Sequence, residues 1–253
     1  MSIKHKLGWR PDKPDKRDRY YEPVMSLAAL PPKVDIGDIP IWQQGDIGSC
    51  TANAILSGYV FTQVRQELQP MLSPPPSRLF LYYNERWIEG TTQQDAGAEL
   101  RDGMKALARW GVCNEEQWPY DTNVLYVEPP SDIYKLAKPN RILKYFRIRQ
   151  NVPAMRECLA SGYPFVFGFS VYTSFESDEV AKTGVMPMPS GDEPLLGGHA
   201  VEAVGYDDEK KVFKIRNSWG TEWGDNGYFY MPYDFIADED YAADFWTIRK
   251  VSR

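Results

Sequence analysis

The strongest constraint on the fold is a change of apolar pattern part-way along the chain. Before about residue 137, apolar residues recur every three or four positions, which predicts helices at 50–69, 77–87 and 99–110. After that point short apolar runs predict strands at 165–172, 199–206, 211–218, 227–233 and 245–251, with one helix at 152–160. A helical half followed by a barrel-like half predicts an α+β fold, with a site in the cleft between two lobes.

The start of the chain is rich in proline. Six prolines precede residue 41, which predicts an extended segment rather than a helix, and we expect the fold to begin after it. Residues 1–19 hold seven Lys or Arg and three Asp, a net charge of +4, so the remainder carries −10 of the total of −6. An acidic body argues against a broad nucleic-acid footprint. Two interpretations of this arm stay open, a solvated tail and a segment that regulates access to a site.

Composition narrows the class of protein. Hydrophobic residues are 43% and charged residues 25% of 253, with no apolar run near the roughly 18 residues of a membrane span, and no membrane partner is predicted. The N-terminus lacks the apolar region of a secretory signal. Three scattered cysteines, Cys50, Cys113 and Cys158, do not make a disulfide framework. We therefore expect a cytoplasmic or other reducing compartment, with export by a non-classical route left open.

Cys50 has a setting that a core cysteine does not need. It follows a Gly/Asp/Gly/Ser loop and begins an apolar helical segment, where the helix dipole stabilises a thiolate. Of the two histidines, His5 lies in the arm and His199 begins a predicted strand, so His199 is the candidate base. Asn217, on the strand that a hairpin returns beside His199, is placed to orient the imidazole. The residues thus predict a nucleophile, a base and an orienting group.

Several motifs resemble the papain family of cysteine proteases, over the chain from about residue 30 to its end. They are Gln44 six residues before Cys50, "GSC" at 48–50, "GGHA" at 197–200 and "NSWGTEWGDNGY" at 217–228. "GGHA" is more similar to cathepsin B than to papain itself, and "GWRPDKPDKRD" is similar to the start of some bacterial members. The resemblance implies a two-lobed fold: an arm at 1–29 that is a possible short prosegment, a helical lobe at 30–137 and a β-rich lobe at 138–253.

The resemblance also implies roles for individual residues. Cys50 would be the nucleophile, His199 the base and Asn217 its orienting group, while Gln44 would donate to the oxyanion. Trp219 and Trp223 would shield the bond between Asn217 and His199, and Trp219 would also contact substrate. Further substrate contacts would come from the backbone of Gly97 and Ala98 and from a pocket lined by Gly168 and Gly198, with Phe245 or Trp246 near its floor. The implied activity is that of a cysteine endopeptidase, which hydrolyses peptide bonds in peptides or proteins through a thiolate-imidazolium pair and an acyl-enzyme. The enzyme would be a zymogen and would need no metal or organic cofactor.

The sequence departs from the family signature at two positions, and two other functions stay open. Ile47 and Thr51 stand where the family signature has a cysteine and an aromatic residue, so one disulfide and one wall of the site are missing. One alternative is a catalytically inactive papain-like binding protein. The other is a Cys/His acyltransferase, a class that usually orients its histidine with a carboxylate where this chain has Asn217. The oligomeric state, the host and the biological substrate do not follow from the sequence.

Overall fold

A computed structural model describes residues 4–22, 30–37, 39–67 and 74–252. Its helical lobe holds α1 (Cys50–Arg65), α2 (Arg78–Glu89), α3 (Leu100–Trp110), a 3-10 turn (Thr122–Val124) and α4 (Ser131–Ala137). The three predicted helices of this lobe are confirmed, and each starts within one residue of its expected position. The predicted end of the first helix, at residue 69, lies outside the described residues. In the described part of the chain no helix is long and apolar enough to cross a membrane.

Local capping explains where several helices begin and end. Ser77 Oγ accepts from Phe80 N at the start of α2, and Gly90 ends that helix in the left-handed conformation with φ 72°. In the second half of the chain Asn151 Oδ1 caps α5 (Val152–Ala160), which has the bounds that the sequence predicts. The predicted strand at 165–172 is likewise found as β3 (Phe165–Tyr172).

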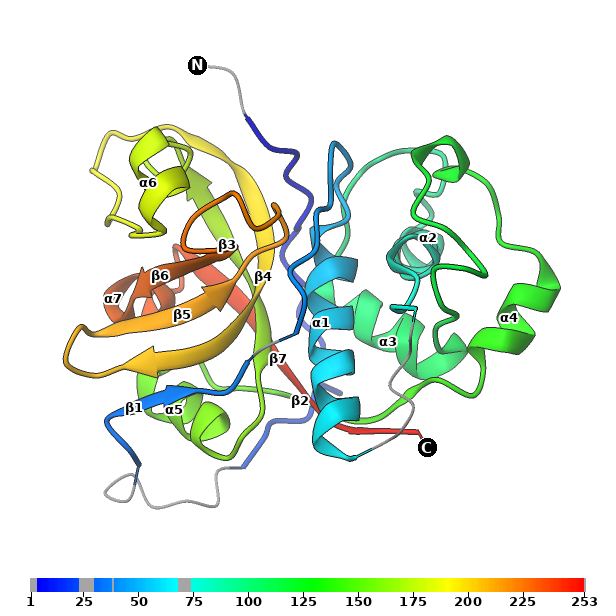
Figure 1. Cartoon of the computed structure of the whole chain (residues 1–253), viewed down its shortest axis with the longest axis horizontal. Coiled ribbons are helices and arrows are strands. Elements are labelled where there is room, and N and C mark those ends of the chain that lie inside the picture. Colours follow the sequence, from blue (N-terminus) through cyan, green and yellow to red (C-terminus); the bar gives the residue numbers. More distant parts are fainter. Residues whose placement is uncertain (1–3, 23–29, 38, 68–73, 253) are drawn as a thin grey trace.

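The strands of the second half form one antiparallel sheet in the order β2-β7-β3-β4-β5-β6, with β1 paired to β4. Their bounds are β1 (Lys33–Asp35), β2 (Ile142–Arg147), β4 (Leu195–Asp207), β5 (Val212–Arg216), β6 (Tyr228–Pro232) and β7 (Ala242–Val251), and two short helices accompany them, α6 (Asp178–Thr183) and α7 (Tyr233–Ala237). The sheet is open, so the predicted barrel-like arrangement does not close. Figure 1 shows the sheet on one side and α2 to α4 on the other, with α1 between them.

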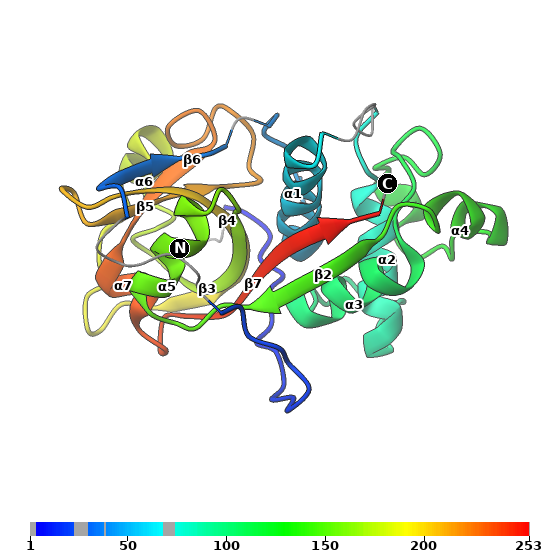
Figure 2. The same cartoon turned by 90° about the horizontal axis from the view of Figure 1, so that it is seen from below.

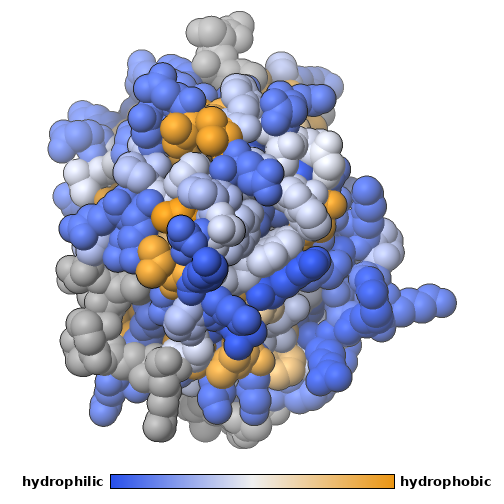
Figure 3. Space-filling view, turned by 90° about the vertical axis from the view of Figure 1, so that its right-hand side faces the viewer, coloured by the Kyte–Doolittle hydropathy of each residue, from blue (hydrophilic) through white to orange (hydrophobic). Residues whose placement is uncertain are grey.

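The side chains pack into two hydrophobic clusters. One surrounds α1, which is buried on almost every side, and the other fills the concave side of the sheet. The division does not follow the chain strictly, because Ile142 of β2 and Ile248 of β7 belong to the helical cluster. Figure 2 shows these two strands running side by side past α1. On the outer face of the helical lobe, hydrophilic side chains predominate and the hydrophobic ones are scattered (Figure 3).

The N-terminal arm is part of the fold, which corrects the expectation that the fold begins after the proline-rich segment. The arm is extended, as its prolines predict, but it runs between the two lobes (Figure 1). Trp9 is 8% exposed and belongs to the cluster around α1. The sequence argument failed here because an extended segment carries no periodicity, and its burial depends on a groove made by distant residues.

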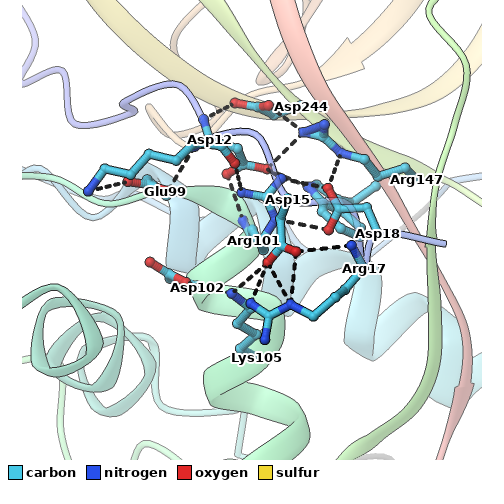
Figure 4. Close-up of polar contacts among 12 residues, drawn as sticks. Asp12, Asp15, Arg17, Asp18, Glu99, Arg101, Asp102, Lys105, Arg147 and Asp244 are labelled. Carbon is cyan, nitrogen blue, oxygen red and sulfur yellow. Dashed lines mark hydrogen bonds and ion pairs between the residues drawn. The ribbon is translucent and has the colours of Figure 1, made fainter. Parts of the chain in front are cut away.

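The second half of the arm, residues 12–21, is called the anchor segment below. Asp12 has a fully covered side chain that accepts from Arg101 N and from Arg147 Nη2, each at 2.9 Å. Asp18 pairs with Arg101 at 2.5 Å, and Asp12 N donates to Asp244 at 2.7 Å (Figure 4). Because Arg101 lies on α3 and Arg147 on β2, these contacts fasten the arm to both lobes.

Candidate active site

Cys50 is the first residue of α1, and its sulfur lies beside Ala200 of β4. Burial raises the pKa of its thiol, and the backbones of Ala200 and Gly8 close to it act in the opposite direction. The loop before the helix is held by Asp95, whose carboxylate accepts from Gly48 N at 2.9 Å. The fold therefore places the thiol at the positive end of a 16-residue helix and next to the strand that carries His199.

His199 and Asn217 form the arrangement that the sequence predicts for a base and its orienting group. His199 Nε2 and Asn217 Oδ1 are 2.8 Å apart, and Asn217 Oδ1 also accepts from Ser218 N at 2.8 Å. The backbone donor fixes the oxygen of the amide toward the ring, so Nε2 of His199 carries the hydrogen. Nδ1 of His199 is buried and has no hydrogen-bond partner among the described residues, which leaves it available to a thiol.

Two tryptophans cover this pair. The Trp219 ring stacks on His199 with centroids 4.7 Å apart, and Trp223 meets Trp219 edge to face at 5.0 Å. Both indoles are buried. Trp219 therefore excludes water from the ring of His199 directly, while Trp223 holds Trp219 in place.

Gln44 lies where a donor to a developing oxyanion would be useful. Its Nε2 donates to the carbonyl of Ile47 at 3.1 Å and to the carbonyl of Lys6, in the arm, at 3.0 Å. Its Oε1 accepts from Ser218 Oγ at 2.6 Å, which fixes the orientation of the amide. Sequence reasoning passed over Ser218, although it lies inside the "NSWG" motif. The arm thus presents a carbonyl oxygen to the group that the sequence predicts as an oxyanion donor.

The first half of the arm, residues 4–10, is called the cover segment. Gly8 N and Trp9 N donate to Gly198 O at 3.1 and 3.0 Å, and Ala98 N donates to Gly8 O at 2.8 Å. His5 stacks on the outer face of Trp219 with centroids 3.9 Å apart. A Cβ at residue 8 would overlap the backbone of Gly48, so only glycine allows this close approach. The cover segment therefore fills the cleft over Cys50.

The predicted substrate contacts are partly rearranged. Ala98 uses both backbone groups toward the arm, because Arg10 N donates to its carbonyl at 3.0 Å. Gly97 does not supply a backbone donor, since its N–H donates to Tyr82 Oη at 3.1 Å. Its role is steric, because a Cβ there, at φ 68°, would overlap Gly8 O.

The predicted pocket lies under the arm. Gly168 and Gly198 both face the Trp9 ring. Trp246 belongs to the same apolar cluster as Trp9, whereas Phe245 packs into the core of the sheet, with its ring stacked on Phe167 at 5.2 Å. Of the two residues predicted near the floor of the pocket, Trp246 is therefore the better placed.

Burial sets the protonation of the two central groups while the cover segment is in place. Cys50 and His199 are both 0% exposed. Burial raises the pKa of the Cys50 thiol to about 12, against the opposing backbone donors. It lowers the pKa of His199 to about 4, and nearby His5 lowers it further, while the bond to Asn217 acts in the opposite direction. Both groups are therefore neutral at neutral pH in this state.

Three neighbouring carboxylates lie close enough together to hold a metal ion. The carboxylates of Glu89, Glu99 and Asp102 lie within 4.8 Å of one another. Each already pairs with a cation, Arg10, Lys13 and Lys105 respectively. These carboxylates are thus balanced by side chains, and an ion is not required to explain them.

Comparison with known proteins decides the family. The model of the papain family cysteine proteases matches residues 90–239, more than half of the chain. An uncharacterized peptidase C1-like protein of Acanthamoeba polyphaga mimivirus is 40% identical over 99% of this chain and 89% of its own length. The chain belongs to the papain family of cysteine proteases. As a member of that family it is a papain-like cysteine peptidase, and the predicted fold and activity are confirmed.

A solved structure and a second relative support the same family assignment. A crystal structure of xylellain, a cysteine protease from Xylella fastidiosa, has a TM-score of 0.91 and 43% identity over 99% of both chains. Cathepsin B-like CP1 of Giardia intestinalis is 39% identical over 85% of this chain and 73% of its own length. The names of these proteins refer to a cysteine protease, a peptidase-like protein and a cathepsin B-like protein, so they give no support to the inactive binding protein or the acyltransferase.

Proposed function

We propose that Cys50, His199, Asn217 and Gln44 carry out peptide-bond hydrolysis in this papain-family enzyme, on peptide or protein substrates without a nucleic-acid or membrane partner. The observation that carries the proposal is the 2.8 Å bond from His199 Nε2 to Asn217 Oδ1, which leaves Nδ1 of His199 free. The next residue along β4 is Ala200, whose backbone lies close to the Cys50 sulfur. An oriented base beside a thiol at a helix N-terminus is the arrangement that nucleophilic catalysis by cysteine requires.

The chemistry follows from these positions. The Cys50 thiolate attacks the carbonyl carbon, the S–C bond forms, and the carbonyl electrons move to oxygen, which accepts from Gln44 Nε2 and from the backbone N–H of Cys50. The thiolate forms when the Cys50 thiol gives its proton to His199 Nδ1, and the C–N bond breaks while this proton passes from Nδ1 to the leaving amine. Water attacks the thioester, His199 accepts its proton, and the S–C bond breaks to release the acid and the thiolate.

The same proposal includes latency, which fits a zymogen. The cover segment places the backbone of Gly8 beside the Cys50 sulfur and the carbonyl of Lys6 on Gln44 Nε2, so it occupies both positions that a reacting peptide would need. Burial under it also disfavours the thiolate and the imidazolium. Substrate access therefore requires the cover segment to leave.

The compartment remains a prediction. Cys50, Cys113 and Cys158 are free and buried, which supports a reducing environment. A reducing compartment would also keep the proposed nucleophile as a thiol.

Alanine variants test the residue roles. Cys50→Ala and His199→Ala are expected to lower kcat/KM on the order of 10⁴-fold or more, and Asn217→Ala to lower it less, because orientation is only part of what the base needs. Cys113→Ala is the matched control, since it removes a second buried thiol outside the site. A folded Cys50→Ala protein that cleaves peptides at the wild-type rate would overturn the proposal.

A further inference from the structure

His5 of the cover segment lies between an indole ring and a buried carboxylate. Its ring is stacked on Trp219, with centroids 3.9 Å apart and the two planes 6° from parallel. Its Nδ1 lies 3.0 Å from Oε2 of Glu176. The Glu176 side chain is only 6% exposed, and its Oε1 is buried without a hydrogen-bond partner among the described residues. One carboxylate oxygen therefore stays unpaired, and a donor group larger than imidazole could bind it.

Glu176 and Trp219 lie on the side of the cut that carries the leaving amine. In the proposed reaction His199 Nδ1 gives its proton to that amine, so the substrate residue that supplies the amine must lie beside the His199 ring. Trp219 is stacked on that ring with centroids 4.7 Å apart. The side chain of the first substrate residue after the cut would therefore extend over Trp219 and reach Glu176, in the place that His5 now fills.

Packing holds the carboxylate in this place. Phe175 is 1% exposed and contacts Trp219 and Trp223, with ring centroids 5.7 and 5.5 Å apart. Glu176 N donates to Thr173 O at 3.2 Å, in the turn that leads from β3 to α6. None of these contacts involves the arm, so we expect Glu176 to keep its position when the cover segment leaves.

The charges at this end of the cleft favour a cation. Among the described residues, the only ion-pair partner of Glu176 is His5. Asp178 of α6 pairs with Lys4, also in the cover segment, at 2.5 Å. When the cover segment leaves, both carboxylates lose these partners, and a buried carboxylate without a counter-charge is unfavourable. A basic substrate side chain would restore the pairing, whereas an acidic one would be repelled.

A guanidinium group matches this site more closely than an ammonium group. It is planar, so it can stack on the Trp219 ring as the His5 ring does. It also presents a fork of N–H donors that can bind both oxygens of one carboxylate, including the oxygen of Glu176 that imidazole leaves unpaired. The ammonium group of lysine is a compact charge without this planar fork.

We propose that Glu176 and Trp219 select an arginine side chain, and lysine less strongly, at the first substrate residue after the cut. The proposal rests on the peptidase function proposed above. It treats His5 as an internal occupant of this site, which substrate replaces when the cover segment leaves.

The test uses the full-length chain and internally quenched peptides that differ only at the first residue after the cut, with Arg, Lys, Gln, Ala or Glu there. Mass spectrometry of the products identifies the bond that is cleaved. The ratio of kcat/KM between two peptides does not depend on how often the cover segment opens, because the open fraction scales both equally. Arg is expected to exceed Ala by about 10-fold or more, with Lys between them and Glu below Ala.

Glu176→Gln keeps the size of the side chain and removes its charge, so the Arg peptide is expected to lose most of its advantage over the Ala peptide. Weaker binding of His5 in this variant would raise the rates of all peptides together, and the ratio cancels that effect. Glu179→Gln is the matched control, because it removes the same charge from an exposed residue of α6. The ratio is expected to be unchanged there.

Several outcomes would overturn the selection while leaving the peptidase function intact. They are equal rates for the Arg and Ala peptides, a preference for Glu, an unchanged ratio in Glu176→Gln, or an equal fall of the ratio in Glu179→Gln. Gly8→Ala, whose new Cβ overlaps the backbone of Gly48, disfavours docking of the cover segment. If neither the folded wild type nor folded Gly8→Ala cleaves any peptide, the proposed function fails and the selection fails with it.

Discussion

Burial acts on Cys50 and His199 in opposite directions. It raises the pKa of the thiol to about 12 and lowers that of the imidazole to about 4, so each group loses its charged form under the cover segment. When the cover leaves, water returns, the thiol pKa falls and the imidazole pKa rises. The thiolate and imidazolium can then stabilise each other.

A change of one arm residue should release the cover. In Gly8→Ala the new Cβ overlaps the backbone of Gly48, so docking is disfavoured and kcat/KM for a small peptide is expected to rise about 10-fold or more. Gly191→Ala, an exposed glycine variant, should leave it unchanged. A Gly8→Ala enzyme no faster than wild type would show that the arm does not limit access.

Labelling of Cys50 should be faster without the cover. With the cover docked, Cys50 is fully buried and burial raises its pKa to about 12, so only molecules whose cover has opened react and labelling at pH 6 is expected to be slow. In Gly8→Ala the cover docks less often, so labelling at pH 6 is expected to be faster. Mass spectrometry after brief alkylation measures both, and Cys113, whose pKa burial also raises to about 12, is the internal control. Identical profiles for Cys50 in the two proteins would contradict the burial argument.

At the level of elements, α1, α2 and α3 meet around a buried carboxyl group. Glu85 of α2 is fully buried and accepts from Thr51 Oγ1 of α1 at 2.7 Å. A Cβ at Gly103 of α3 would lie 2.5 Å from Glu85 Oε1, so glycine allows the helices to approach this closely. Burial raises the pKa of Glu85 to about 8. The three helices therefore pack around a neutral acid at neutral pH.

Replacing Glu85 should reduce the dependence of the free energy of unfolding on pH. Because the folded pKa of about 8 exceeds the ordinary value of 4.5, the folded state keeps a proton that the unfolded state loses between these pH values. The free energy of unfolding therefore falls by roughly 1.4 kcal/mol per pH unit from about pH 4.5 to about pH 8 and levels off above it. Glu85→Gln mimics the protonated acid, so its free energy of unfolding should fall less than that of wild type between pH 6 and pH 9. Denaturant titrations measure it, and parallel curves for the two proteins would contradict the assignment.

The sequence predicted long elements well and short ones poorly. The helices α1, α2, α3 and α5 have strong periodicity or clear caps, whereas α4, α6 and α7 span five to seven residues, too few for a period to stand out. Strand β1 has three residues and is recognisable only through its pairing with β4. In the site, Cys50, His199, Asn217 and Gln44 were predicted from motifs and stay a prediction, but the place of the arm was not predicted, because its partners are far apart in the sequence.

Across the whole molecule, the arm has two parts with different attachments. The cover segment is held by backbone bonds, by the buried ring of Trp9, by the ion pair of Arg10 with Glu89 and by exposed pairs such as Lys4 with Asp178. The anchor segment buries Asp12 between Arg101 and Arg147 and pairs Arg19 and Tyr21 with the backbone of Arg147. The cover can therefore open while the anchor remains in place.

Two truncations separate these roles. Deleting residues 2–10 should raise kcat/KM and leave the fold intact, because the anchor stays. Deleting residues 1–29 also removes Asp12 and Asp18, so Arg101 and Arg147 lose the charged hydrogen bonds that join them to the arm, which is expected to lower stability by about 1.5 kcal/mol or more. Thermal unfolding and peptide cleavage of both proteins measure this, and equal stabilities would show that the anchor is dispensable.

Because the cover stays attached through the anchor, it lowers the apparent affinity for substrate at every protein concentration. A tethered segment competes at a fixed local concentration, however dilute the protein is. The apparent affinity for substrate equals the intrinsic affinity multiplied by the fraction of molecules that are open, so an open fraction of about 1% weakens it about 100-fold. Dilute substrates would then be left intact and abundant ones cleaved, and the stability of the docked cover, as much as the active site, would set the concentration at which the enzyme begins to act.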